Sequence, residues 1–365
     1  MVHVITDAGP HPYFRTLIEV GGLERRGLIV GCVGPEGPLQ HEMRELGVGT
    51  FALGASSRAG YPAAAVRLAR LLRSTDADVV QTHLVDGTLV GLTAGRLARV
   101  PVSVMTAHHS HELPFHGRRL AWPERVACGP LSDHIIAPSE QVAATLAQLA
   151  HARREKIAVV HHGFDLARLD PAVLDGSGVR RELGLEGKLV FGAIGRIYAL
   201  KNYPALLEAF AVALRDVPEA RLVIAGPGDA AALARDAQRL GVGERVVFSG
   251  PREDIPQLLA ALDAFVHPAI AESFGMVIVE AMAMAKPVLS TPVGIAPEVI
   301  TSGESGVLCA GSDQGDLERG LGELLSLRDR WAELGSRGRT RVSGFTARAT
   351  ADAYERLYRA WVGPR

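Results

Sequence analysis

The chain has 365 residues, of which 47% are apolar and 22% are charged, and its formal net charge at pH 7 is −1. This length suits two globular domains, and the balanced charge gives no reason to expect a nucleic acid or an anionic membrane as a partner. No apolar run approaches the roughly 20 residues needed to span a bilayer, and "MVHVITDAG" is typical of a strand and turn rather than a signal peptide, so we expect a cytoplasmic protein.

Short apolar runs alternate with amphipathic helical patterns from the start of the chain. In the first half, the predicted helices include Pro62–Arg73, Gly87–Arg99 and Glu140–Leu149. The predicted strands there are Val2–Thr6, Leu28–Cys32, Asp78–Thr82, Val102–Thr106, His134–Ala137 and Ile157–Val160. Continuous Val/Ile/Leu strands separated by helices indicate a parallel sheet that is covered on both faces.

The alternation stops over residues 165–187, a connection that contains Pro, Gly and Asp, and then starts again. The predicted strands of the second half are Leu189–Ile194, Arg221–Ala225, Arg245–Phe248, Ala264–Val266 and Val288–Ser290. The pattern predicts an α/β protein with two Rossmann-like, doubly wound domains, residues 1–170 and 171–345, that face across a cleft. We expect a last helix, within residues 346–365, to pack back toward the N-terminal domain. Ligands of such sheets bind at the carboxyl ends of the strands, so the cleft is the expected site.

Two carboxylates, Glu272 and Glu280, are eight residues apart in "AESFGMVIVEAMA". At about 1.5 Å per helical residue they are roughly 12 Å apart along the chain. Two carboxylates that act on one sugar carbon are only about 5–9 Å apart. The longer spacing suits a ligand with phosphates in the middle and a hydroxylated group at each end, which is the shape of a nucleotide-diphosphate sugar.

The segment between the glutamates predicts an anion site. We expect a helix from Phe274 to Ala285 with Ser273 as its N-cap. The amides of the first helical turn then lack carbonyl partners, and together with the helix dipole they suit a phosphate group. The residues expected to contribute are Ser273, Phe274, Gly275, Met276 and Val277.

The longer stretch "HPAIAESFGMVIVEAMAMAKPVLSTPVGIAPEVI" closely resembles the E-x7-E region of glycosyltransferase family 4, whose members are retaining enzymes of the GT-B fold. "FGAIGRIYALKNYPALLEAF" is similar to the G-R-x4-K segment of that family, which implies that Arg196 and Lys201 bind the donor diphosphate. Fixed cations are also what a departing pyrophosphate needs on chemical grounds. The resemblance further implies that Glu272 binds sugar hydroxyls and Glu280 the nucleoside ribose.

The chain departs from the family pattern in several places. His162-Gly163-Phe164-Asp165 stands where the family has Asn-Gly-Val-Asp, Ile295 replaces the usual second Gly before Pro-Glu, and Ala285 stands where Gly is common. The N-terminal loop reads "AGPHPYF" rather than Gly-Gly, which puts a contact from Gly9 to the donor phosphate in doubt. None of these departures changes Arg196, Lys201 or the two glutamates.

Histidines are concentrated in the first half, and His267 alone lies after residue 162. "TAHHSH" follows the strand Val102–Thr106, and the family has a histidine near the transferred sugar two residues after the Thr. The resemblance therefore implies His108, with His109 as the alternative if the register shifts by one residue. Another possibility is that these histidines only bond loop backbone.

We expect no metal and no other cofactor. His108, His109 and His111, with Glu112 nearby, match no known metal-ligand spacing. "DAD" at residues 76–78 imitates a metal-binding D-x-D motif, but it opens a strand at the end opposite the expected site. "HGRRLAWPERV", which contains Arg118, Arg119, Trp122 and Arg125, could contact an anionic or lipid-linked acceptor, although a surface amphipathic turn is favoured.

The sequence thus predicts a metal-independent retaining glycosyltransferase that moves a sugar from a UDP- or GDP-sugar to a hydroxyl acceptor by front-side attack. The expected catalytic residues are His108, Glu272, Arg196 and Lys201. A nucleotide-sugar 2-epimerase of the same fold and a non-catalytic nucleotide-sugar-binding module are the alternatives. The acceptor stays open between a lipid, a polysaccharide, a small metabolite and a natural product.

Overall fold

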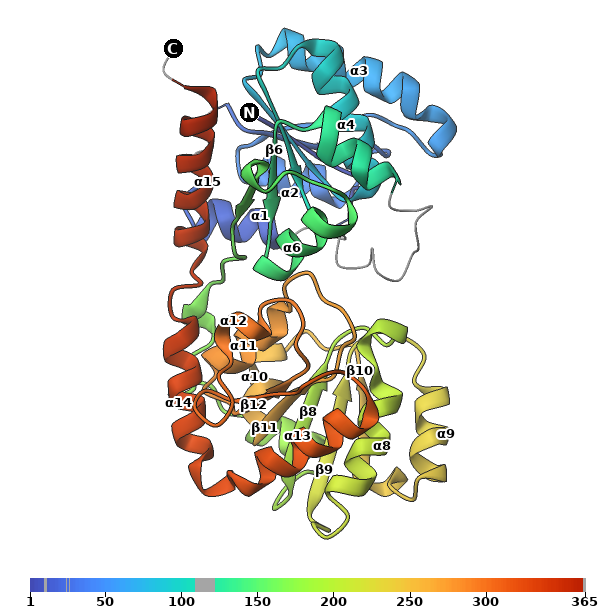
Figure 1. The fold of residues 1–365 in the computed structure, drawn as a ribbon, viewed down its shortest axis with the longest axis vertical. Coiled ribbons are helices and arrows are strands. Elements are labelled where there is room, and N and C mark those ends of the chain that lie inside the picture. The colour runs from blue at the N-terminus through green and yellow to red at the C-terminus, as the bar shows by residue number, and fades with distance from the viewer. Residues whose placement is uncertain (10–11, 24, 26, 109–121, 364–365) are drawn as a thin grey trace. The chain divides into compact units, whose positions relative to one another are not determined.

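The computed structural model describes residues 1–9, 12–23, 25, 27–108 and 122–363. The chain forms two compact units, shown in Figure 1. The first unit contains Met1–Asp165 and the chain from Phe345 onward, and the second contains Leu166–Gly344. Each unit is a parallel sheet with helices on both faces, because strands that are buried on both sides can only be covered in this way.

The first unit has a seven-stranded sheet in the order β3-β2-β1-β4-β5-β6-β7, and every neighbouring pair is parallel. Its strands are β1 Val2–Ile5, β2 Ile29–Cys32, β3 Gly49–Ala52, β4 Val79–His83, β5 Val102–Thr106, β6 His134–Ala137 and β7 Ile157–Val159. Its described helices are α1 Pro12–Arg15, α2 Pro38–Glu45, α3 Tyr61–Ser74, α4 Val85–Ala98, α6 Glu140–Leu149 and α15 Ala347–Val362.

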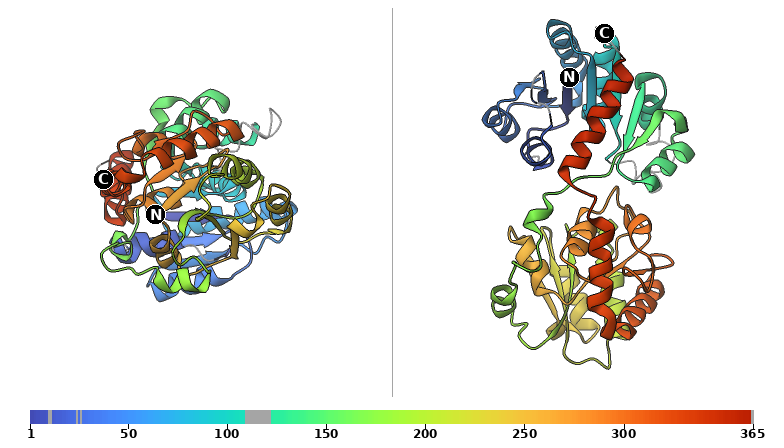
Figure 2. Two further views of the ribbon diagram at one scale, coloured as in Figure 1. Left: turned by 90° about the horizontal axis from the view of Figure 1, so that it is seen from below. Right: turned by 90° about the vertical axis from the view of Figure 1, so that its left-hand side faces the viewer.

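Helix α15, near the end of the chain, covers one face of the first sheet, as the right-hand view of Figure 2 shows. Its buried Ala351, Tyr354 and Tyr358 share a hydrophobic cluster with side chains of β1 and β2. The hydroxyl of Tyr358 donates to Gln81 Oε1 on β4, so the helix is attached by a buried polar contact as well as by packing. Helices α3 and α4 cover the opposite face.

The second unit has a six-stranded parallel sheet in the order β10-β9-β8-β11-β12-β13. Its strands are β8 Leu189–Ile194, β9 Ala220–Ala225, β10 Val246–Gly250, β11 Ala264–His267, β12 Val288–Ser290 and β13 Val307–Leu308. Its helices are α7 Ser177–Glu182, α8 Tyr203–Ala213, α9 Ala231–Arg239, α10 Ile255–Ala261, α11 Met276–Ala283, α12 Ala296–Val299, α13 Gln314–Ser326 and α14 Trp331–Val342. Helices α8, α9 and α13 cover one face through a common core cluster.

The sequence missed two edge strands, β3 and β13. β3 is partly exposed along its whole length and β13 has only two residues, so neither gives the continuous apolar run of a buried strand. The "DAD" residues lie in the turn between α3 and the amino end of β4, as predicted. All three cysteines are buried and unpaired. Within the described residues, we find no helix both long and apolar enough to cross a membrane.

Candidate functional site

The site of the second unit begins where β8 ends. Gly195 follows the strand, Arg196 is exposed on the next position, and a 3-10 turn, Ala199–Lys201, leads into α8. The Tyr203 hydroxyl, at the start of α8, donates to the Gly195 carbonyl at 3.0 Å. This bond joins the two ends of the segment 195–203. Arg196 and Lys201 therefore lie in one constrained turn at the carboxyl end of a central strand.

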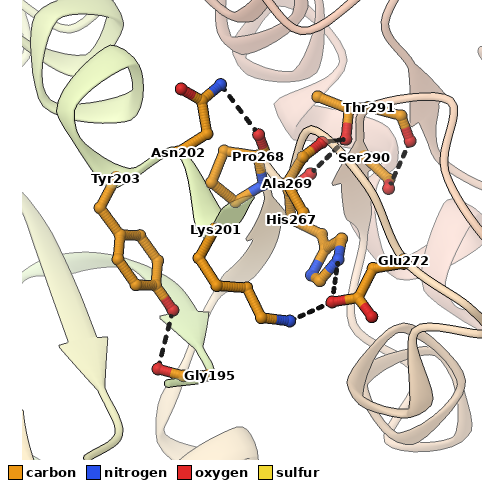
Figure 3. Close-up of polar contacts among 10 residues, drawn as sticks. All are labelled: Gly195, Lys201, Asn202, Tyr203, His267, Pro268, Ala269, Glu272, Ser290 and Thr291. Atoms are coloured by element: carbon orange, nitrogen blue, oxygen red, sulfur yellow. Dashed lines mark hydrogen bonds and ion pairs between the residues drawn. The ribbon is translucent and has the colours of Figure 1, made fainter. Parts of the chain in front are cut away.

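A second loop, which follows β11, approaches that turn and is held to it by hydrogen bonds to backbone carbonyls. Asn202 Nδ2 donates to the Pro268 carbonyl at 3.1 Å, and the Ile270 amide donates to the Leu200 carbonyl at 2.8 Å. On the other side, the Thr291 hydroxyl donates to the Ala269 carbonyl at 2.6 Å (Figure 3). Anchored on both sides, the loop presents Glu272 at a defined position.

Glu272 joins the two loops through its carboxylate. Its Oε1 accepts a hydrogen bond from Lys201 Nζ and lies 3.4 Å from His267 Nε2, as Figure 3 shows. Burial alone would raise the pKa of Glu272, but the contacts with His267 and Lys201 outweigh it and lower that pKa to about 2. Burial lowers the pKa of His267, so the imidazole is neutral near pH 7. The cluster therefore holds a carboxylate that is ionised at neutral pH, so it can accept hydrogen bonds but has no proton to donate.

The helix after Glu272 starts later than predicted. Helix α11 begins at Met276, and the residue before it, Gly275, is the N-cap with φ of 86°; the prediction of Ser273 as N-cap is therefore wrong. A glycine can adopt this left-handed conformation without the Cβ clash that other residues suffer, so the chain turns there rather than at Ser273. Ser273 and Phe274 belong to the loop, and the first helical amides are those of Met276 and Val277.

Gly294 allows a neighbouring loop to lie against the segment that contains Glu272. Its φ is +55°, and a Cβ at this position would fall against the Phe274 carbonyl and 3.2 Å from Glu272 Cβ. The Ile295 amide donates to the same Phe274 carbonyl at 2.7 Å. Ile295 itself has an ordinary helical φ of −82° and is buried, so this departure from the family pattern causes no backbone strain.

Glu280 lies in α11 on the same helix that begins beside Glu272. Burial raises its pKa to about 7, so the carboxyl is close to half ionised at neutral pH. A partner that donates hydrogen bonds to the carboxylate would favour its charged form. The pKa values of the two glutamates are thus shifted in opposite directions: that of Glu272 is lowered and that of Glu280 is raised.

His108 lies in the first unit, just past the carboxyl end of β5. Its Nε2 is 3.0 Å from His83 Nδ1, and its ring stacks on that of His162 with centroids 5.7 Å apart. His162 is buried, which lowers its pKa to about 4.

In the N-terminal loop, the Gly9 amide donates to Asp7 Oδ1 at 2.9 Å. His109, His111, Glu112, Arg118 and Arg119 lie outside the described residues, whereas Trp122 is exposed.

The sequence missed several residues that shape these sites. His267 carries the clearest signal, because it is the single histidine after residue 162 and directly follows a predicted strand, which the structure extends to include it. Asn202 and Thr291 hold the loop by side-chain bonds to backbone carbonyls and carry no periodic signal at all. His3 and His83 precede His108 in a chain of ring contacts that only the strand order brings together.

Comparisons with solved structures agree with this architecture. The structure of Anabaena HepE, in complex with UDP and glucose, superposes with a TM-score of 0.85 over 98% of this chain and 99% of that one, at 22% identity. WaaG, a glycosyltransferase involved in lipopolysaccharide biosynthesis, superposes with a TM-score of 0.72 over the full length of both chains, at 17% identity. Two doubly wound units with these neighbours define the chain as a GT-B protein.

Sequence comparisons give the family. A model described as Glycosyltransferase Family 4 matches residues 13–168, and one described as Glycosyl transferases group 1 matches residues 179–341. The chain is 35% identical over 240 residues to a D-inositol 3-phosphate glycosyltransferase of Nocardia farcinica, which covers 63% of this chain and 53% of that protein. A Streptomyces scabiei protein of the same name is 34% identical over 241 residues, 61% and 54% of the two chains. The chain belongs to glycosyltransferase family 4, and its matches span about half the length of these curated relatives.

Proposed function

We propose that this protein is a retaining glycosyltransferase that transfers a sugar from a nucleotide-diphosphate sugar to a hydroxyl acceptor without a metal ion. The observation that carries the proposal is the Lys201–Glu272–His267 cluster at the carboxyl ends of β8 and β11. A cation for phosphate and an ionised acceptor for hydroxyls lie side by side there, as the sugar end of such a donor requires. UDP is the favoured nucleotide, because HepE was solved with UDP bound.

In this reaction the second unit binds the donor. Arg196 and Lys201 neutralise the diphosphate as the bond to the anomeric carbon breaks, and the amides of Met276 and Val277 add the positive end of the α11 dipole. Glu272 accepts hydrogen bonds from sugar hydroxyls, because its low pKa keeps it ionised. Glu280 accepts from the nucleoside ribose.

Transfer takes place by front-side attack. The acceptor oxygen bonds to the anomeric carbon on the face from which the diphosphate leaves, and its proton passes to the departing phosphate oxygen. The ionised Glu272 supplies no proton, and the long spacing between the two glutamates does not suit a double displacement by a carboxylate pair. His108 contacts the sugar or acceptor and stabilises the charge-separated transition state.

One experiment separates this proposal from its alternatives. The purified protein is incubated with UDP- and GDP-sugars and a panel of hydroxyl acceptors, and the products are analysed by mass spectrometry and NMR. We expect free nucleoside diphosphate and a glycoside with the anomeric configuration of the donor. An epimerised nucleotide sugar would identify an epimerase, binding without turnover a binding module, and an inverted glycoside or a trapped glycosyl-enzyme would overturn the front-side mechanism.

A further inference from the structure

The first unit contains a column of nearly parallel imidazole rings, joined edge to edge through their nitrogens, that begins in its sheet. The rings of His3 and His83 have centroids 5.2 Å apart, and those of His83 and His108 are 5.3 Å apart, with interplanar angles of 15° and 25°. His3 belongs to β1, His83 ends β4 and His108 follows β5, and these three strands are consecutive in the sheet. Among the described residues no group of histidine, cysteine or acidic side chains is arranged to hold a metal ion, so the column needs another explanation.

Two hydrogen bonds run along the column. His3 Nδ1 is 2.9 Å from His83 Nε2, and His83 Nδ1 is 3.0 Å from His108 Nε2. Both ring nitrogens of His83 are therefore engaged. The tautomer of an imidazole is set by the hydrogen bonds that its nitrogens make. The tautomers of the three rings are therefore linked, because each ring shares a hydrogen bond with the next.

Counting protons leaves two arrangements. Three neutral rings carry three protons, and each of the two hydrogen bonds holds one of them. The third proton must sit at one end of the column, either on His3 Nε2 or on His108 Nδ1. Burial favours the neutral form of the two inner rings, since His3 and His83 are each 3% exposed and burial lowers the pKa of His3 to about 3. We take His108 as neutral at pH 7.5, above the ordinary imidazole pKa of about 6.5.

The surroundings of His3 decide between the two ends. Its Nε2 is buried and has no hydrogen-bond partner within the described part of the chain. A proton at that atom would be an orphaned buried N–H, which is rarer in proteins than an acceptor with an unused lone pair. The third proton is therefore favoured at the other end, on His108 Nδ1.

We propose that His3 and His83 are positioning residues that hold His108 in its neutral Nδ1–H tautomer. In this form His108 Nδ1 donates a hydrogen bond to an oxygen of the bound sugar or acceptor and cannot take a proton there. The functional part of this inference rests on the role proposed for His108 in transfer. The tautomer itself is a property of the column and can be measured without any substrate.

The direct test is NMR of the full chain labelled with 15N-histidine, with long-range proton–nitrogen correlations of the imidazole rings. We expect the Nδ1–H tautomer for His3, His83 and His108 at pH 7.5. A proton on Nε2 of His108, with a bare Nδ1, would overturn the proposal. Because the wild-type protein is observed, this result does not depend on whether a variant folds.

Two variants of His83 then separate the relay from simple packing. The amide of His83→Gln can accept from His3 and donate to His108, so the tautomer and kcat should be largely kept. His83→Phe keeps an aromatic ring but makes neither bond; it should mix the tautomers of His108 and lower kcat about tenfold or more. Nucleoside diphosphate affinity should be unchanged in both.

His134→Phe is the matched control, because this ring stacks on Trp361 with a centroid distance of 4.2 Å and takes no part in the column. Its kcat and the tautomer of His108 should equal those of the wild type. Equal losses in His83→Gln and His83→Phe would reduce His83 to a packing residue and overturn the relay. If no sugar transfer is found with any donor, the proposed function fails, while the NMR spectrum still decides the tautomer.

Discussion

The ammonium group of Lys201 and the carboxylate of Glu272 form an ion pair that joins two motifs 71 residues apart. Each side chain is only 14% exposed, so solvent screens the pair weakly. The motifs were expected to act on different parts of the donor, one on the diphosphate and one on the sugar. Their contact makes them a single electrostatic unit, in which a bound diphosphate shares Lys201 with Glu272.

Removal of Lys201 should destabilise the protein because it leaves a mostly buried carboxylate without its cation. We expect Lys201→Met to lower the free energy of unfolding by up to about 3–5 kcal/mol, with the contact from His267 to Glu272 limiting the loss. Urea denaturation monitored by circular dichroism at pH 7.5 measures the change.

The double variant Lys201→Met/Glu272→Gln is the control for this pair. It removes both charges and should regain much of the lost stability, since a buried ion pair can often be replaced at little cost. If the stability lost in the double variant equals the sum of the losses in Lys201→Met and Glu272→Gln, the two charges are not coupled.

Donor binding should depend on pH through Glu280. Burial raises the pKa of this carboxyl to about 7, and ribose hydroxyls bind its ionised form better. Affinity for UDP-glucose should therefore be weak at pH 6, increase as the pH rises through about 7, and level off near pH 8. UDP-glucose is the suitable ligand, because its diphosphate is esterified at both ends and does not titrate in this range. Calorimetry at several pH values gives the profile.

Glu280→Gln provides the comparison for that profile. The variant should bind UDP-glucose more weakly by about 1–3 kcal/mol at pH 8, the usual contribution of a hydrogen bond to a charged group. Its affinity should also be flat between pH 6 and pH 8. Unchanged affinity, or a pH dependence that persists in the variant, would remove Glu280 from the ribose site.

Transfer should survive chelation of divalent metals. In the proposed reaction Arg196, Lys201 and the first amides of α11 stabilise the leaving diphosphate in place of a metal ion. Turnover after dialysis against EDTA should equal that of untreated protein. Loss of activity that Mg²⁺ or Mn²⁺ restores would establish a metal requirement.

Ala285→Gly should stabilise the protein. Ala285 has a φ of +53°, a left-handed conformation that costs an L-residue about 1–2 kcal/mol and a glycine almost nothing. The greater freedom of glycine in the unfolded chain offsets part of this gain, so we expect a net increase of up to about 1 kcal/mol. Thermal and urea unfolding measure it. Ala283→Gly, at the last position of α11, should instead destabilise by about 0.5–1 kcal/mol.

His108→Ala should lower kcat strongly and leave nucleoside diphosphate affinity nearly unchanged. The reason is that His108 belongs to the first unit, whereas the proposed diphosphate ligands belong to the second. Steady-state kinetics and calorimetry separate the two effects. His109→Ala is the comparison: if it alone is damaging, the predicted register is wrong by one residue, although the mechanism stands.

The sequence alone determined the family and where the central strands and helices lie along the chain. β5, β6, β8 and β12 lie at their predicted residues, because continuous apolar runs and helical periods are local signals. The edge strands β3 and β13 and the first residue of α11 were missed or misplaced. Their signals are short, and the backbone conformation of Gly275 outweighed the capping preference of Ser273.

Only the tertiary structure decided how the polar residues are paired. Lys201 meets Glu272, and His3, His83 and His108 form one column, because parallel strands that are distant in the chain are neighbours in the sheet. The ionisation of the glutamates was equally invisible in the sequence, since burial raises the pKa of one and two neighbours lower that of the other. A motif fixes which chemical groups are present, but a pKa and a tautomer depend on what surrounds each group after folding.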